Sequence, residues 1–256
     1  MGQLVETCGQ PRFVYRGGAD ASWGLETALD RLGVEAGGRP HSFAQFERAL
    51  LDSFARAARG FLRHEPKNTW EYLALGQHFG LPTRLLDWTF SPLVALYFAV
   101  EPPSERDRAV WTLDWEAMHR HFGLKAAPYD AASLEDEFGR ELGNVFEIPA
   151  RGRPPSFACL FMPPAVDDRI VAQAGVFTVA TETSLSLDAF LAAAEASIVL
   201  RKVVIPSDAA PGMRAELDTL GFTASRLFPG LDGLARSVRA RFTELARQTL
   251  TKGGTI

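Results

Sequence analysis

The sequence is poor in cysteine and in long apolar runs. Two cysteines among 256 residues, Cys8 and Cys159, cannot build a disulfide framework or a multi-cysteine zinc site. Reduced thiols in the cytoplasm are the expected state. The first ten residues lack the basic and apolar parts of a signal peptide, and the apolar run at residues 93–100 is far shorter than the ~20 residues of a membrane span. A cytoplasmic protein that does not cross a membrane is therefore predicted.

An excess of positive charge is also lacking. The chain carries 27 Lys and Arg against 31 Asp and Glu, which gives a net charge of −4. A broad, sequence-independent nucleic-acid binder needs a basic face, so that class is disfavoured. A small basic pocket for an anionic ligand remains compatible with this balance. With 46% hydrophobic residues, the chain can bury the core of an ordinary globular domain.

The common catalytic motifs are missing as well. The sequence has no Walker loop, no dinucleotide-binding glycine fingerprint after a strand, no nucleophile elbow and no HExxH. His119 and His121 have no cysteine or carboxylate at ligand spacing beside them, so a solvated helix face is favoured over a metal site. No metal is predicted.

Hydrophobic periodicity and turn residues predict a mixture of strands and helices. Strands are expected at residues 12–16, 110–113, 157–162, 170–179 and 198–205, and residues 85–89 suit a buried strand or a turn. Helices are expected at residues 41–62, 69–79, 115–122, 188–196, 211–220 and 231–250. Ser42 and Ser91 are candidate N-caps, the second followed by Pro92 and an apolar, central helix. Residues 123–156 are interpreted as an insertion or surface subregion of a single domain.

The segment at residues 76–92 places several polar groups directly before the apolar helix. They are an amide, an imidazole, a guanidinium, a carboxylate, an indole and three hydroxyls: Gln77, His78, Thr83, Arg84, Asp87, Trp88, Thr89 and Ser91. Polar groups beside a core element must be paired or used. One interpretation is structural, with Arg84 and Asp87 as a buried ion pair that pins the turn. The other is a ligand pocket, completed by Arg16 at the end of the first strand, beside Gly17.

A second polar intrusion lies in the expected strand at residues 170–179 and just before it. In a regular strand, Arg169, Val171 and Gln173 would share one face. Two interpretations stay open, an edge strand with one wet face and a binding role for Arg169. Farther along, a turn containing Phe228 leads into the closing helix, where Asp232 is a candidate cap.

Four blocks of this sequence together resemble the FRG domain family. The blocks are Tyr15-Arg16-Gly17, the run from Gln77 to Ala99, the pattern from Arg169 to Phe177, and the turn from Leu227 to Gly233. The family is named for a Phe-Arg-Gly near its start, where this chain has Tyr15 in place of the phenylalanine. The blocks stretch over residues 13–235, so the resemblance implies one FRG-like domain over the chain.

The order of motifs in this family looks like that of ADP-ribosyltransferases, which transfer ADP-ribose from NAD. The resemblance implies an α+β fold with a split, mostly antiparallel sheet and an N-terminal helical region. It implies catalytic roles for Arg16 on the first strand, Thr89 before the apolar helix and Gln173 in the third motif. The third motif departs from the superfamily, because residues 169–177 contain no glutamate and Glu182 lies beyond them. The role of that glutamate then falls to Gln173, or shifts to Asp87 or His78.

The remaining residues of the predicted pocket are assigned to NAD binding. They are Tyr15, Gly17, Gln77, His78, Arg84, Asp87, Trp88, Ser91, Arg169 and Phe177. An arginine fork suits a diphosphate, and aromatic rings suit nicotinamide or adenine. The function implied by the resemblance is an NAD-dependent ADP-ribosyltransferase, as an antiviral-defence or toxin effector. The sequence does not identify the acceptor, for which a nucleic acid and a protein are the candidates, and it leaves a neutralising partner open. The alternative is a non-catalytic module that binds a nucleotide or a nucleic-acid end in the same pocket.

Overall fold

The computed structural model describes residues 12–35, 43–62, 64–101, 104–138, 157–164, 168–181, 185–196 and 199–251. Its centre is a six-stranded antiparallel sheet with the strand order β4-β5-β2-β1-β3-β6, which does not close into a barrel. The strands are β1 (Phe13–Gly18), β2 (Leu85–Thr89), β3 (Arg108–Asp114), β4 (Ala158–Phe161), β5 (Gly175–Ala180) and β6 (Leu200–Ile205). The predicted combination of helices with an antiparallel sheet is confirmed.

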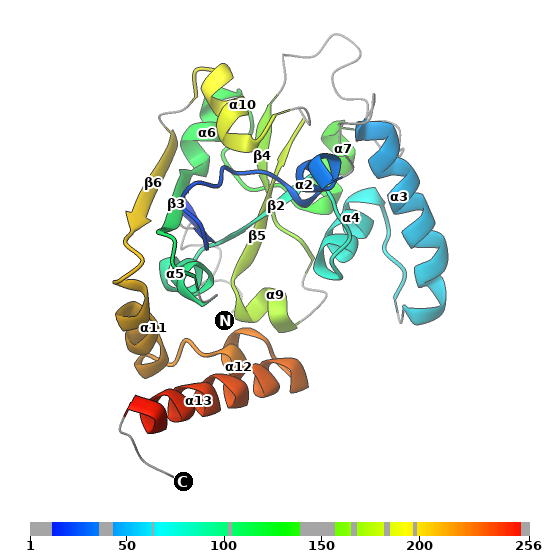
Figure 1. Ribbon diagram of the computed structural model, residues 1–256. Helices are drawn as coiled ribbons and strands as arrows, with labels where there is room; N and C mark the ends of the chain where they lie inside the picture. The colour runs from blue at the N-terminus through cyan, green and yellow to red at the C-terminus, as the bar shows by residue number, and fades with distance from the viewer. Residues whose placement is uncertain are drawn as a thin grey trace, which may run out of the picture.

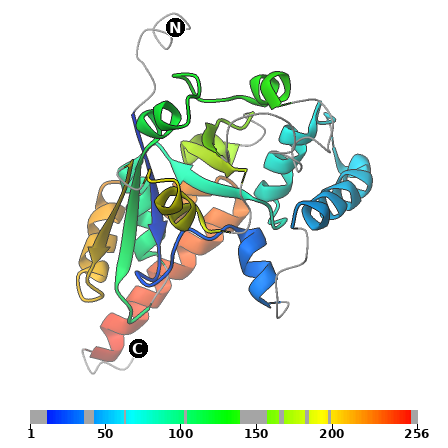
Figure 2. The ribbon, with the colours of Figure 1, turned by 90° about the horizontal axis from the view of Figure 1, so that it is seen from above.

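The pairing of β1 with β2 is the weakest junction in the sheet. These strands share the single register pair Tyr15–Thr89, whereas β1 pairs with β3 along its whole length from Phe13 to Gly18. β2 likewise pairs with β5 along its whole length. The two halves of the sheet, β4-β5-β2 and β1-β3-β6, therefore diverge at β1 and β2 (Figure 2). Side chains from both halves face the space that this divergence opens.

Helices surround the sheet (Figure 1). They are α2 (Ala28–Glu35), α3 (Phe43–Ala58), η1 (Arg59–Phe61), α4 (Thr69–His78), α5 (Pro92–Val100), α6 (Trp115–His121), α7 (Ala131–Phe138), α9 (Asp168–Ala172), α10 (Leu187–Ala193), α11 (Ala210–Thr219), α12 (Ala224–Leu227) and α13 (Leu231–Thr251). In Figure 1, α3, α4 and α7 lie at one end of the sheet, and β6 lies at the other. Within the described ranges, no helix has both the length and the apolar character needed to cross a bilayer.

The helix α5 starts where the sequence predicts and packs on β1. The Ser91 hydroxyl accepts a hydrogen bond from the Val94 N–H at 3.4 Å, and Pro92 occupies the first helical position. A Cβ atom on Gly17 would lie 2.0 Å from the carbonyl oxygen of Ala95. Only glycine therefore lets β1 approach α5 this closely. Arg16 is the residue before Gly17, so this close contact also fixes the position of its backbone.

The predicted strand at residues 170–179 is wrong in its first half. Asp168–Ala172 forms the short helix α9, and the strand β5 begins only at Gly175. The backbone of Ala174, at a φ of 46°, ends the helix and turns the chain into the strand. Arg169, Val171 and Gln173 consequently do not share a strand face, and the edge-strand interpretation falls with it.

The expectation of a solvated helix face around His119 is also wrong. His119 is completely buried, and its Nε2 accepts a hydrogen bond from the Leu160 N–H at 2.8 Å. Its Nδ1 must then carry the proton and donate to the carbonyl of Lys125 at 2.9 Å. Burial lowers the pKa of His119, which keeps the ring neutral. This histidine therefore joins α6 to β4 as a structural group.

Some predictions fall outside the described residues. Ser42, Glu182 and the stretch at residues 139–156 belong to this group. The earlier part of the predicted insertion is described, and there Tyr129 and Leu134 are completely buried in one core cluster with Trp70. These residues contribute to the core, while the interpretation of residues 123–156 as one subregion of a single domain stays a prediction.

Candidate functional site

A cavity of about 1110 Å³ opens where the two halves of the sheet diverge. Most of the predicted site residues line it: Tyr15, Arg16, Gly17, Gln77, His78, Asp87, Trp88, Thr89, Arg169, Gln173 and Phe177. Arg84 and Ser91 are not among its lining residues. The structure therefore brings Arg16 together with the polar segment that precedes α5, although more than sixty residues separate them in sequence.

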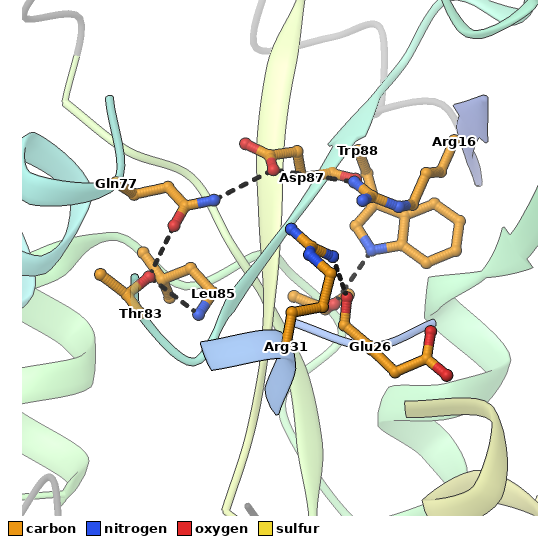
Figure 3. A network of polar contacts seen from close by, with 9 residues as sticks. Arg16, Glu26, Arg31, Gln77, Thr83, Leu85, Asp87 and Trp88 are labelled. Atoms are coloured by element: carbon orange, nitrogen blue, oxygen red, sulfur yellow. Dashed lines mark hydrogen bonds and ion pairs between the residues drawn. The ribbon is translucent and has the colours of Figure 1, made fainter. Parts of the chain in front are cut away.

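Arg16 extends from β1 across the divergence toward β2 (Figure 3). Its Nη1 donates to the carbonyl oxygen of Asp87 at 2.8 Å and lies 3.7 Å from Oδ2 of the Asp87 carboxylate. Burial lowers the pKa of the guanidinium, and the neighbouring Asp87 partly opposes that effect. Arg16 is charged at neutral pH, because arginine side chains are not deprotonated in proteins. Among the described residues one of its five N–H donors is engaged, which leaves most of the fork available to an anion.

The carboxylate of Asp87 projects into the cavity and is held by a short relay of hydrogen bonds. Its side chain is 59% exposed, and Oδ2 accepts from Gln77 Nε2 at 3.0 Å. The hydroxyl of Thr83 donates to Gln77 Oε1 at 2.7 Å and accepts from the Leu85 N–H at 3.2 Å. The backbone donor at Leu85 thus fixes the direction of every hydrogen bond in the relay (Figure 3). Asp87 is therefore oriented toward Arg16 from the opposite wall.

The predicted ion pair between Arg84 and Asp87 does not form. Arg84 instead pairs with Glu47 of α3, with Nε 2.6 Å from Oε2, and both side chains are buried. The backbone N–H of Arg84 donates to the other carboxylate oxygen at 2.7 Å. Side chains three residues apart in extended chain point to opposite faces, which separates Arg84 from Asp87. Arg84 thus holds α3 against the start of β2, away from the cavity.

Trp88 and Thr89 form the floor of the cavity and make internal hydrogen bonds. The indole of Trp88 is 3% exposed and donates to the Thr178 hydroxyl at 2.9 Å. The Thr89 hydroxyl donates to the Gln173 carbonyl at 2.6 Å and accepts from the Ser91 N–H at 3.0 Å. One acceptor lone pair of Thr89 is left for a ligand, and the face of Trp88 is largely covered.

The third predicted motif contributes side chains from α9 and from the turn that follows it. Gln173 Nε2 donates to the carbonyl of Leu227 at 2.9 Å, which ties this wall to the segment before α13. The guanidinium of Arg169 lies 4.7 Å from the centre of the Phe228 ring, a cation–π distance. Among the described contacts, the amide oxygen of Gln173 is the part of that side chain left for a ligand.

Several lining residues were not predicted from the sequence. They are Asp20, Trp23, Glu26, Arg31 and Trp111, and they come from the loop after β1, from α2 and from β3. Arg31 donates to the carbonyl of Glu26 at 3.0 Å, and hydrogen bonds from Ser22 hold the pKa of Asp20 at about 2. Asp20, Trp23 and Glu26 lie in the loop, where side chains carry no periodic signal, whereas Arg31 and Trp111 line the cavity because of how α2 and β3 are placed in the fold.

The chemistry of the cavity is that of an anion and ring binder. Among the described residues, no three histidine, cysteine or acidic side chains are grouped to hold a metal ion. The walls offer a guanidinium fork from Arg16, a solvent-accessible carboxylate from Asp87 and the rings of Tyr15, Trp23 and Trp111. This combination suits a ligand that has both anionic and planar aromatic parts.

Comparisons with known proteins identify one family. No curated protein and no solved structure is significantly similar to the chain. The FRG domain matches residues 11–108, which include β1, the polar segment and α5. The blocks of resemblance around Gln173 and Phe228 lie beyond the matched residues. The sheet junction, Arg16 and Asp87 all fall inside the matched residues, and this part of the chain is similar to the FRG domain.

Proposed function

We propose that the cavity binds NAD and that the protein is an ADP-ribosyltransferase-like enzyme. The observation that carries the proposal is the approach of Arg16 and Asp87, with guanidinium nitrogen and carboxylate oxygen 3.7 Å apart in a cavity between two half-sheets. A cation for the diphosphate and a carboxylate for the sugar stand side by side there. The volume of about 1110 Å³ exceeds the range of common ligand pockets, which leaves room for a dinucleotide.

The role of the carboxylate goes to Asp87 in this proposal. Gln173 and Thr89 have uncharged side chains, so neither offers a negative charge, and both already donate to backbone carbonyls, of Leu227 and of Gln173. The carboxylate of Asp87 is accessible and held in direction by Gln77. A fixed negative charge stabilises the positive charge that develops on the ribose, and it needs no reorganisation during the reaction.

The reaction breaks the bond between C1″ of the ribose and the nicotinamide nitrogen. Both electrons of that bond leave with nicotinamide, which becomes neutral, and C1″ becomes an oxocarbenium-like centre next to Asp87. The acceptor forms a new bond to C1″ and releases its proton to Asp87 or to water. Arg16 holds the diphosphate throughout, because a bidentate guanidinium matches two phosphate oxygens.

Nicotinamide release and transfer of labelled ADP-ribose test this function. The wild-type protein is incubated with labelled NAD, with and without cell lysate, next to Arg16→Gln and Asp87→Asn. We expect turnover by the wild type and a loss of at least about a hundredfold in each variant. Thermal unfolding of all three proteins shows that they are folded. Absence of both nicotinamide release and label transfer from the folded wild type contradicts the proposal.

A non-catalytic binding module is the second candidate, and one observation favours it. The third motif contains Gln173 in place of an acidic residue, and its amide nitrogen is tied to the backbone. Calorimetric titration with NAD and with ADP-ribose separates the two functions. Tight binding of both ligands with no nicotinamide release supports the module.

A further inference from the structure

A row of side chains crosses three strands on one face of the sheet, beside the cavity. Arg16 of β1 is the register partner of Trp111 of β3, and Trp111 is the partner of Lys202 of β6. Directly paired residues in antiparallel strands project from the same face. The Lys202 ammonium lies 4.5 Å from the centre of the Trp111 ring and donates to the carbonyl of Trp23 at 3.2 Å. We name Trp23, Trp111 and Lys202 the Trp–Lys strip, and Arg16 lies next to it, at the proposed NAD site.

The strip is accessible and has a positive charge that no carboxylate balances. The indole of Trp23 is 57% exposed, and Trp23 and Trp111 both line the cavity. Within the described ranges, no carboxylate lies within 4.0 Å of Lys202, whose contacts there are a carbonyl and a ring. The nearby carboxylate of Asp20 is held by Arg106 at 2.6 Å. The strip therefore offers two indoles and one cation, the ammonium group of Lys202, to a ligand.

A nucleotide has the complementary chemistry. A nucleobase stacks on an indole, and its phosphate pairs with an ammonium or guanidinium group. An acidic peptide supplies the charge but lacks a planar ring next to it. The net charge of −4 argues against a long nucleic-acid track, so the strip holds one or two nucleotides.

We infer that the Trp–Lys strip is the acceptor subsite, and that it binds a nucleotide, either free or at the end of a single strand. The transfer step rests on the proposed function, whereas the binding does not. In that step the C1″–nicotinamide bond breaks, nicotinamide leaves with the electron pair, and a nitrogen or oxygen of the bound nucleotide forms the new bond to C1″. The proton of that acceptor atom goes to water.

Fluorescence anisotropy with a labelled single-stranded 12-mer, as DNA and as RNA, measures the binding at low salt. Unlabelled AMP competes in a second arm and separates a free nucleotide from a strand end. Trp23→Ala is compared with Phe61→Ala, which removes an 89% exposed ring that does not line the cavity. Lys202→Gln is compared with Arg201→Gln, because residue 201 lies on the same strand and points to the opposite face.

We expect Trp23→Ala to weaken oligonucleotide binding by about tenfold or more, the usual effect of losing one stacking ring. Lys202→Gln should weaken binding severalfold and reduce the slope of log K against log salt by about 0.7. Phe61→Ala and Arg201→Gln should stay within about twofold of the wild type. AMP that competes as strongly as an unlabelled 12-mer identifies a free nucleotide, and weaker AMP identifies a strand end.

Three results overturn the inference. The first is wild-type protein that binds neither the 12-mer nor AMP. The second is equal weakening by Trp23→Ala and Phe61→Ala. The third is a Trp23→Ala protein that loses affinity for NAD and keeps its affinity for the oligonucleotide, because the strip would then serve the donor. Nicotinamide release by the wild type is measured separately, so a failure of the proposed function is distinguishable from a failure of this site.

Discussion

Two arginine–carboxylate pairs flank the same strand, β2, and differ in almost every respect. Arg84 and Glu47 are 4% and 1% exposed and lie 2.6 Å apart, and Glu47 also accepts from the backbone of Arg84. Arg16 and Asp87 are 23% and 59% exposed, and their charged atoms lie 3.7 Å apart over the cavity. The first pair is closed and cannot receive a ligand without breaking. The second has spare donors and acceptors.

The difference shows that an ion pair near a pocket is not by itself a functional signal. A buried, closely bonded pair is costly to break, so substitution of either member should damage the fold. A loose pair over a cavity contributes little to stability, because the charged atoms of Arg16 and Asp87 lie 3.7 Å apart and Asp87 keeps much of its hydration. Substitutions in the Arg84–Glu47 pair should therefore reduce stability most, and substitutions in the Arg16–Asp87 pair should reduce ligand binding most.

The largest effect on stability is expected from Glu47→Ala. It removes the Glu47 carboxylate that binds the buried guanidinium of Arg84 and accepts from the Arg84 N–H. We expect a loss of about 3–5 kcal/mol in the free energy of unfolding, measured by urea denaturation. Glu65→Ala is the control, since it breaks an exposed pair with Arg59 and should cost less than about 1 kcal/mol. Equal losses in the two variants would remove the distinction between closed and open pairs.

Gly17→Ala should be the next most damaging substitution, although Gly17 lines the cavity. An added Cβ would lie 2.0 Å from the Ala95 carbonyl oxygen and 2.6 Å from the Ala99 nitrogen. Backbone of α5 would have to move, at a cost of about 3 kcal/mol, near the upper end for overpacking. Thermal unfolding measures the loss. Gly18→Ala is the matched control, because there the nearest atom is 3.8 Å away. If the two alanines melt alike, close contact with α5 is not the reason for a glycine at position 17.

The sequence was sufficient for features that depend on neighbours along the chain. The capped start of α5 follows from Ser91-Pro92, and the closing helix α13 follows from its own periodicity. The sequence also pointed to Arg16 and to residues 77–91 as parts of one site, from the polar groups gathered before α5 and from the family resemblance. The structure places Arg16 and five of the predicted residues of this segment around one cavity, Gln77, His78, Asp87, Trp88 and Thr89, and leaves Arg84 and Ser91 outside its lining.

Features that depend on distant partners could not be predicted. The partner of Arg84 is Glu47, thirty-seven positions earlier in the chain, whereas the sequence suggested the nearby Asp87. The branched residues Ile170 and Val171 resemble a strand, yet they belong to α9. The residue after α9, Gln173, is held by the Thr89 hydroxyl, which donates to the Gln173 carbonyl. Tertiary contacts of this kind override local propensity.

Thr83→Val tests the relay that connects the buried region with the cavity. Thr83 is completely buried, and its hydroxyl accepts from Leu85 and donates to Gln77. Valine keeps the shape and removes both hydrogen bonds, which should cost about 1–3 kcal/mol. Because Gln77 then loses its orientation toward Asp87, turnover of NAD should also fall.

Thr83→Ser is the control for that relay, since it retains the hydroxyl. Recovery of turnover by serine is the expected outcome, measured as kcat and KM for nicotinamide release. If valine and serine support the same turnover, then Thr83 is only a core residue. Loss of stability without loss of turnover in the valine variant leads to the same conclusion.

The smallest change in stability is expected from Arg16→Gln. Burial lowers the pKa of this guanidinium, so the charged side chain carries a desolvation cost that its contacts with Asp87 only partly offset. Removing the charge should change the free energy of unfolding by less than about 0.5 kcal/mol. Affinity for NAD should nevertheless fall by about 10- to 100-fold, because a hydrogen bond to a charged group contributes about 1.5–3 kcal/mol. Calorimetry measures the affinity, and denaturation measures the stability.

Two further variants decide whether the fork or merely the charge of Arg16 matters. Arg16→Lys keeps the charge and loses the bidentate geometry, so its affinity for NAD should lie between those of the wild type and Arg16→Gln. Arg12→Gln removes the same charge from the start of the same chain segment, where Arg12 pairs with Asp114 outside the cavity. It should leave NAD affinity within about twofold of the wild type. If the lysine variant binds NAD as tightly as the wild type, Arg16 acts through its charge alone. The contrast between the Arg16–Asp87 pair and the Arg84–Glu47 pair would then rest on burial rather than on geometry.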